Sequence, residues 1–213
     1  MLRPIINSFA IIAITLVVET VIISLAGYAF ARYRFRGKEL FYYMILGVLM
    51  IPAALMLIPL FTVVNQLKLY GGYGALILPY AAGQQIFGIL LARSFYSTLP
   101  DDFFEAARID GAGELFAFLR IGVPLSVPIL ITIGITNLLG MYNDYVWPSI
   151  VLSGGDWQKT FCQAVFSIAT GGGSVDYGIS SAMFVIGSIP LILITSSCLK
   201  YYLKGIMEGA VKA

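Results

Sequence analysis

Long apolar stretches alternate with short polar ones along this chain. A helix that crosses a bilayer needs about 20 predominantly apolar residues, because each residue adds 1.5 Å. Five stretches meet this requirement, at residues 5–30, 40–65, 74–97, 124–147 and 177–203. The pattern predicts an all-α, polytopic transmembrane helical bundle of five spans, forming a single domain over residues 1–213.

The composition agrees with a membrane protein. Hydrophobic residues make up 59% of the chain and charged residues 11%, whereas a soluble domain has about 25% charged residues. The alternating pattern of a transmembrane β-barrel is absent, so the spans are expected to be helices. The lipid bilayer is therefore a partner, and a net charge of +2 gives no indication of nucleic acid.

One segment is dense in charge, and it lies between the third and fourth spans. Five of the eleven acidic residues fall between positions 101 and 114. Asp102 precedes Glu105 by three residues, which is the spacing of a capping box, and Pro100 lies just upstream. The segment is predicted to begin as a helix. Membrane-surface helices are usually rich in Lys and Arg, so this acidic one is expected to meet a basic protein partner.

The same segment is expected to turn sharply at Gly111. A second short helix from Ala112 then presents an apolar face made by Leu115, Phe116 and Leu119. Together the two helices would form a helix–turn–helix element along the membrane surface.

Basic residues predict the orientation, because cytoplasmic loops carry an excess of Lys and Arg. Ten of the thirteen fall on one side of the predicted spans, and only Arg3, Lys68 and Lys159 fall on the other. The acidic segment and the C-terminus are therefore expected to be cytoplasmic, and the N-terminus outside. An outside N-terminus without a signal peptide indicates that a preceding span is missing, through truncation or a late assigned start.

Prolines, glycines and aromatic residues mark the spans and their loops. Prolines lie inside the predicted spans, where kinks are tolerated if neighbours pack around them; they are Pro52, Pro59, Pro79, Pro128 and Pro190. The largest outer loop, about 149–176, contains a predicted short interfacial helix at 161–168 and a flexible hinge at 171–173. Trp147 and Trp157 lie near span ends, as in an aromatic belt.

The acidic segment carries a recognisable motif. Glu105-Ala106-Ala107, three residues, Gly111, nine residues and Ile121-Gly122-Val123-Pro124 resemble the EAA motif of ABC importer permeases, with Val123 in place of the usual Leu. Nearly the whole chain resembles the carbohydrate-importer, maltose-type branch of that family. In that branch Asn7-Ser8 opens a span, the run 143–148 (N-D-Y-V-W-P) closes another, and the tail matches residues 205–213. Members of the family have one more span at the start.

The resemblance implies a function for the segment 100–121. It would be the coupling helix that docks on a cytoplasmic ATPase subunit, with Glu105 facing a basic residue there. The residues expected to dock are Asp102, Glu105, Ala106, Ala107, Asp110 and Gly111. The other implied partners are a second permease subunit, a second ATPase copy and an extracytoplasmic solute-binding protein, in a bacterial or archaeal cell membrane.

A few polar residues within the spans are further candidates. Asn143 and Asp144 near the outer end of the fourth span, and Gln84 and Gln85 in the third, could line a solute path by hydrogen-bonding hydroxyl groups. The alternative for each is an interhelical hydrogen bond, worth about 0.6–2 kcal/mol. Glu19 lies in mid-span, where an ionisable group marks a functional site by default, and pairing with another helix is its preferred explanation.

The chain is not expected to be an enzyme. It has no histidine and no G-x-x-x-x-G-K-[ST] loop, so no cofactor is expected in it and ATP hydrolysis is assigned to a separate chain. The predicted function is the transmembrane permease subunit of an ATP-driven importer, for a sugar or oligosaccharide. A permease for a non-sugar solute, a secondary transporter with internal repeats and a non-transporting membrane scaffold are the alternatives.

Overall fold

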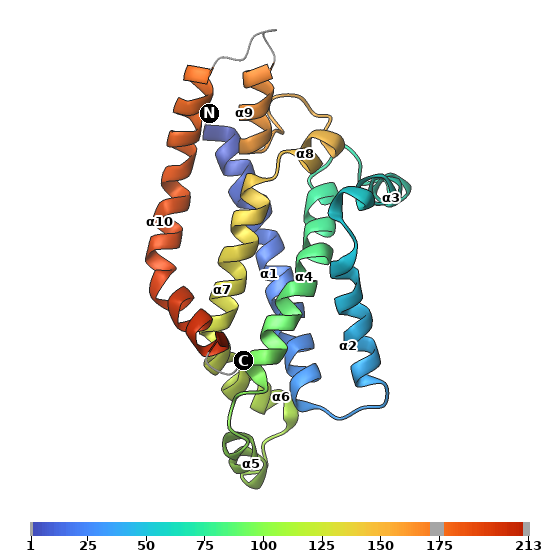
Figure 1. Cartoon of the computed structure of the whole chain (residues 1–213), viewed down its shortest axis with the longest axis vertical. Coiled ribbons are helices and arrows are strands. Elements are labelled where there is room, and N and C mark those ends of the chain that lie inside the picture. Colours follow the sequence, from blue (N-terminus) through green and yellow to red (C-terminus); the bar gives the residue numbers. More distant parts are fainter. Residues whose placement is uncertain (1, 171–176, 211–213) are drawn as a thin grey trace. The chain divides into compact units, whose positions relative to one another are not determined.

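A computed structural model of the chain describes residues 2–170 and 177–210, with the side chains of 201–210 left out. All of its regular elements are helices (Figure 1). They are α1 (Leu2–Arg32), α2 (Lys38–Gly47), the 3-10 helix η1 (Val48–Met50), α3 (Ala53–Gln66), α4 (Gly74–Tyr96), α5 (Asp102–Ile109), α6 (Glu114–Ala117), the π-helix η2 (Phe118–Gly122), α7 (Val123–Asn143), α8 (Val146–Val151), α9 (Phe161–Thr170) and α10 (Tyr177–Ala210). The prediction of an all-α polytopic bundle is confirmed. Helix α9 matches the predicted short helix, and the predicted hinge at 171–173 lies outside the described residues.

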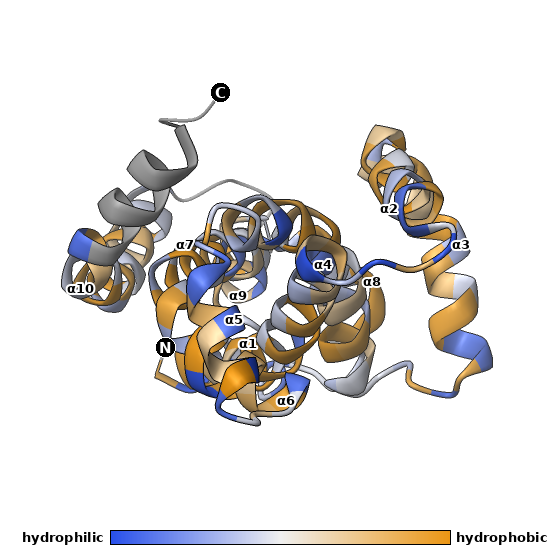
Figure 2. Ribbon diagram, turned by 90° about the horizontal axis from the view of Figure 1, so that it is seen from below, coloured by the Kyte–Doolittle hydropathy of each residue, from blue (hydrophilic) through white to orange (hydrophobic). Residues whose placement is uncertain are grey.

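Four helices among the described residues are long and apolar enough to cross a membrane. They are α1, α4, the continuous helix Glu114–Asn143 and the stretch Tyr177–Lys200 of α10. Figure 2 shows these helices mainly in hydrophobic colours. The pair formed by α2–η1 and α3 makes a fifth span only if the two parts are counted together.

The second predicted span, 40–65, is therefore broken at the predicted proline Pro52. The chain bends by 105° between Lys38–Met50 and Ala53–Gln66, and Pro52 stands directly before α3 with φ −58° and ψ 128°. Proline has no N–H to donate and disfavours the helical conformation of the residue before it. The other four prolines lie inside helices that continue through them.

The described chain forms two compact units, each with its own core. The first comprises residues 1–18, 51–83 and 136–197, and the second comprises 19–50, 84–135 and 198–213. Helices α1, α4, α7 and α10 contribute residues to both units.

Aromatic side chains fill the core of the first unit. Tyr142 stacks on Phe161 with ring centroids 5.3 Å apart. Trp147 is only 4% exposed, and its indole N–H donates to the carbonyl of Ala75 at 2.9 Å. Its place in an aromatic belt is therefore a wrong prediction, whereas Trp157 is 52% exposed. A buried Trp needs a hydrogen-bond partner, and the start of α4 supplies it.

The core of the second unit joins α1, α4 and α7. The hydroxyl group of Tyr96, which is fully buried, lies 2.7 Å from that of Ser24 and 2.8 Å from that of Ser126. Tyr28 packs edge-on against Tyr96, with centroids 5.4 Å apart. Tyr96 of α4 therefore holds both α1 and α7 through buried hydrogen bonds.

Small residues allow α1 and α4 to cross closely in this unit. A Cβ added to Gly27 would lie 2.5 Å from the Cβ of Ala92, and one added to Gly88 would lie 2.4 Å from Cδ1 of Ile23. Such small side chains let the backbones of membrane helices approach each other. The crossing fixes where the end of α1 lies, and the acidic segment is attached there.

Candidate functional site

The acidic segment folds around one buried aromatic residue. In α5, Phe104 is 4% exposed, and its ring lies 5.9 Å from that of Tyr28 on α1. The neighbouring Phe103 is 53% exposed. Because α5 has only eight residues, packing of Phe104 rather than intrinsic helix stability must hold it in place.

The predicted capping box does not form. The N-cap residue is Asp101, Asp102 is the first helical residue, and no side chain donates or accepts a capping hydrogen bond. The backbone carbonyl of Asp101 accepts instead from the N–H groups of Phe104 and Glu105, each at 2.9 Å. The carboxylate of Glu105 is exposed and has no capping role in α5.

Arg32 attaches the start of α5 to the end of α1. Its guanidinium forms an ion pair with Asp101 and donates to the carbonyl of Leu99. It also lies over the ring of Phe104, 4.3 Å from the centroid. The planar guanidinium can make ionic and stacking contacts at once, so a single side chain joins α1 both to the loop that enters α5 and to α5 itself.

Gly111 ends α5 in a Schellman motif. Its φ is +80°, a left-handed conformation that glycine adopts without steric penalty. The N–H of Gly111 donates to the carbonyl of Arg108 at 3.0 Å, and that of Ala112 to the carbonyl of Ala107 at 2.9 Å, which satisfies the last carbonyl groups of the helix. The predicted sharp turn at Gly111 is confirmed.

The second half of the segment differs from its prediction. No separate surface helix begins at Ala112. Instead α6 begins at Glu114, and α6, η2 and α7 form one helix of 30 residues that contains a π-helical turn. Arg108 spans the turn and donates to the carboxylate of Glu114 at 3.0 Å. The pKa of the Arg108 guanidinium is raised above its usual value, mainly because of this hydrogen bond.

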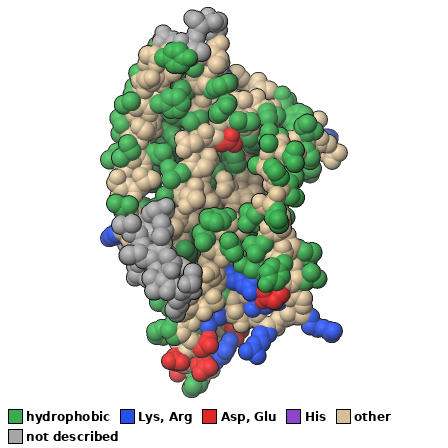
Figure 3. Space-filling model, in the orientation of Figure 1, with side chains coloured by type: hydrophobic (Ala, Val, Ile, Leu, Met, Phe, Trp, Pro, Cys, Tyr) green, Lys and Arg blue, Asp and Glu red, His purple; other side chains and the backbone are tan. Residues whose placement is uncertain are grey.

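The structure brings the predicted docking residues onto one exposed element. Asp102, Glu105, Ala106 and Asp110 are exposed on α5 and its C-cap, and Ala107 is half-buried. Figure 3 shows acidic and basic side chains gathered at the end of the molecule where Figure 1 places α5.

Sequence reasoning missed two apolar side chains of the same element. Phe103 and Ile109 are 53% and 86% exposed. The signal was present, because one helix of eight residues carries two adjacent phenylalanines, which cannot both face the core. Exposed aromatic and aliphatic side chains beside charges are typical of protein interfaces.

Asp144 is held by protein donors in the first unit. One carboxylate oxygen accepts from the N–H groups of Val146 and Trp147, at 2.9 and 3.3 Å, and so begins α8. The other accepts from the hydroxyl group of Tyr80 at 2.8 Å. A carboxylate has about four acceptor positions, so three are filled and one remains.

The other candidate pathway residues are distributed over the two units. Asn143 is exposed in the first unit, where its side-chain amide donates to the carbonyl of Leu139 at 2.9 Å. Gln84 and Gln85 are half-buried in the second unit. Glu19 is 1% exposed, within α1.

Comparison with known proteins identifies the family. The model of the family "Binding-protein-dependent transport system inner membrane component" matches residues 23–207. The chain belongs to this family. It is therefore a membrane permease of a binding-protein-dependent transport system, as its motif and spans predicted.

Individual relatives agree with this assignment. The permease is 34% identical over 206 residues to the "Probable ABC transporter permease protein YurM" of Bacillus subtilis (strain 168), which covers 97% of this chain and 68% of the relative. It is 32% identical to the "Arabinooligosaccharides transport system permease protein AraQ" of Halalkalibacterium halodurans, covering 97% and 72%.

A solved structure shows the same fold. A chain of a bacterial ABC transporter involved in the import of the acidic polysaccharide alginate superposes with a TM-score of 0.80 at 23% identity. The match covers 94% of this chain and 74% of that one.

Proposed function

We propose that the permease imports a sugar or oligosaccharide, and that α5 with its flanking turns docks on a separate cytoplasmic ATPase. The substrate class is supported by the relative whose name specifies arabinooligosaccharide transport. Family membership favours this function over a secondary transporter or a scaffold. The complete transporter would contain a second permease subunit, two ATPase copies and an extracytoplasmic solute-binding protein.

The attachment of α5 is the observation that carries the docking proposal. Phe104 is buried, Arg32 holds both Asp101 and the carbonyl of Leu99, and the acidic face of α5 stays exposed. A partner that pulls on this face would move α5 as a rigid body. The contacts with Tyr28 and Arg32 would pass that movement to α1 and so to the spans.

The residues proposed to line the solute path are Gln84, Gln85, Asn143 and Asp144. Amide groups both donate and accept hydrogen bonds, as sugar hydroxyl groups require. Asp144 has one acceptor position left for a hydroxyl group, in addition to its bonds to Tyr80 and the start of α8.

Glu105 gives a clean test of docking, because its side chain has no capping role in α5. Glu105→Lys should abolish solute-stimulated ATP hydrolysis in the complex formed with the ATPase, the second permease and the binding protein. The reason is that a like charge placed against a basic partner residue costs several kcal/mol. Membrane retention of the ATPase and sugar uptake into proteoliposomes are the two measurements.

A matched control is Asp156→Lys, which makes the same charge change at a side chain that is 93% exposed outside the docking segment. It should leave ATPase retention unchanged. Wild-type ATPase retention in Glu105→Lys would overturn the docking role. Normal retention in the wild-type complex without uptake of any tested sugar would overturn the substrate class alone.

A further inference from the structure

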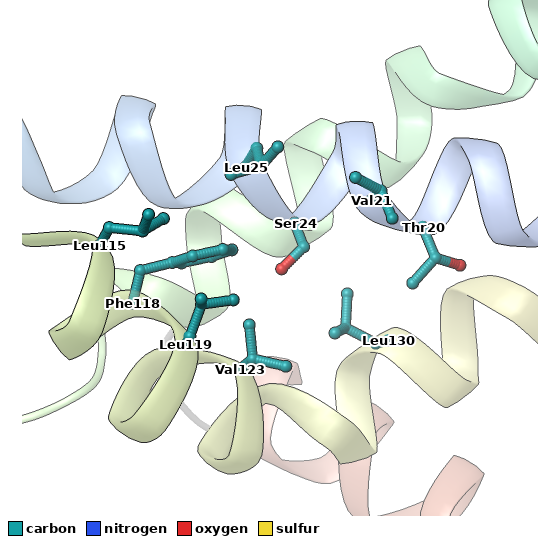
Figure 4. A pocket seen from close by; sticks show the side chains of 9 residues that line it. All are labelled: Thr20, Val21, Ser24, Leu25, Leu115, Phe118, Leu119, Val123 and Leu130. Carbon is teal, nitrogen blue, oxygen red and sulfur yellow. The ribbon is translucent and has the colours of Figure 1, made fainter.

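An apolar groove of about 370 Å³ lies within the second unit, between α1 and the continuous helix α6–η2–α7. Figure 4 shows its walls from both helices. They include Val21 and Leu25 of α1, and Leu115, Leu119, Val123 and Leu130 of the other helix. The groove is open along its length, since Val21, Leu25 and Leu119 are 54%, 46% and 53% exposed.

The chemistry of the lining favours a hydrocarbon ligand. The exposed lining is almost wholly apolar. Ser24, which also lines the groove, already shares its hydroxyl group with Tyr96 at 2.7 Å. A ligand with hydrogen-bonding groups would lose its bonds to water here without replacement.

The groove, of about 370 Å³, suits a thin and flexible occupant. A single extended hydrocarbon chain is much thinner than a helix, which is roughly 10 Å wide, and it can enter sideways from the bilayer through the open side.

A positive charge directly follows the groove-lining Leu119 in the sequence. Arg120 is exposed, and its only contact among the described residues is the ring of Phe116, 6.0 Å from the centroid. Arg120 follows Leu119 directly and precedes Val123 by three residues, roughly 5 Å along the helix. Glu114, the nearest acidic residue in sequence, is held by Arg108 at 3.0 Å. The charge of Arg120 is therefore free to meet a phosphate group.

We propose that this groove binds an acyl chain of an anionic glycerophospholipid whose phosphate lies against Arg120. The acyl chain lies along Leu119, Val123 and Leu130, opposite Val21 and Leu25 of α1. The lipid comes from the cytoplasmic leaflet, because the distribution of basic residues places this end of the helix α6–η2–α7 there. The docking segment is joined to the same end of that helix.

The test uses the assembled transporter in bilayers of phosphatidylcholine. The bilayers contain a few per cent of a probe lipid with a photoreactive acyl chain, which is either a phosphatidylglycerol or a phosphatidylcholine. Crosslinked peptides are then mapped by mass spectrometry. The expected result is preferential labelling of residues 115–130 and 20–25 by the phosphatidylglycerol probe. One basic residue near a lipid surface contributes about 1 kcal/mol, so Arg120→Gln should lower the preference about fivefold.

Two further variants separate binding from folding. Leu119→Trp fills the groove and should remove labelling by both probes, whereas Val185→Trp, at a 64% exposed position of α10, should leave labelling unchanged. Arg120→Gln alters an exposed side chain and does not endanger the fold. Equal labelling of the groove by both probes in the wild type, or no lipid label on residues 115–130 and 20–25, would overturn the proposal.

Discussion

At the residue scale, Arg32 attaches the docking segment to α1 by three different kinds of contact. It pairs with Asp101, donates to a carbonyl and lies over Phe104. Lysine would keep the charge and lose the planar stacking and the forked hydrogen bonds. A substitution that keeps only the positive charge of Arg32 would therefore not preserve the attachment of α5.

Gly111 provides the first prediction at this scale. A Cβ added there meets no atom of the described chain within 4 Å, so the left-handed backbone is the only internal constraint. Gly111→Asp should abolish transport and ATPase coupling while membrane insertion stays within about twofold of wild type, because Asp and Asn tolerate this conformation better than other residues. Uptake, ATPase stimulation and membrane abundance are measured in parallel.

Gly111→Asn is the matched control, because it has the size of Asp without the charge. It should retain more coupling than Gly111→Asp. Uptake at the wild-type rate in Gly111→Asp would show that nothing docks at this turn.

At the element scale, the crossing of α1 and α4 sets the position of the docking segment. The second prediction concerns Gly27, whose added Cβ would lie 2.5 Å from that of Ala92 and 3.1 Å from backbone atoms. Gly27→Ala should destabilise the folded permease by about 1–3 kcal/mol, because overpacking forces the helices apart. The midpoint of denaturant unfolding of the purified complex is the measurement.

Two variants check the cause of that loss. Ala92→Gly combined with Gly27→Ala should recover most of the stability, since the clashing methyl group is removed. Gly134→Ala, where no atom lies within 4 Å, should be neutral or gain about 0.5–1 kcal/mol from helix propensity. A Gly27→Ala midpoint equal to that of the wild type would contradict the close crossing.

The elements also show where sequence reasoning succeeded. Four of the five predicted spans correspond to long helices, because a run of about 20 apolar residues has few other solutions in a bilayer. Gly111 was found because only a small, flexible residue fits a sharp turn after an amphipathic helix. These features are encoded locally, and local patterns were enough to predict them.

Other elements depend on contacts that no local pattern contains. The apolar run 40–65 gave no measure of how far Pro52 would bend it, and the bend is 105°. Trp147 stands near a span end like a belt residue, yet the carbonyl of Ala75, 72 residues away, holds it in the core. The acids at 102 and 105 had capping-box spacing, but the helix begins one residue earlier than a box requires, so Asp102 is its first helical residue and not its N-cap.

At the scale of the whole molecule, the orientation in the membrane is the prediction that can be tested directly. Asp156→Cys should react with a membrane-impermeant maleimide in intact cells, and Arg36→Cys only after permeabilisation, because basic residues favour the cytoplasmic side. Both positions are exposed. The unmodified chain serves as the blank for its own two cysteines, Cys162, which is buried, and Cys198, which is half-buried. The opposite labelling pattern would show that the topology is inverted and that α5 lies outside the cell.

The π-helical turn η2 has a consequence for the angular register of the molecule. Five residues in this conformation join α6 to α7, and π-turns inside α-helices occur often at functional sites. Successive residues of an α-helix are rotated by about 100°. A π-turn closes on the residue five positions away instead of four, so five residues of η2 turn the chain through nearly the same angle as four residues of an α-helix. Removing one residue between Phe118 and Gly122 would let the turn close as an α-helix and leave the charges of α5 on nearly the same side of the permease. Removing one residue from the α-helical part of α7 would instead rotate everything before it by roughly 100°. The π-turn thus accommodates one residue more than an α-turn without changing the direction in which the docking face points.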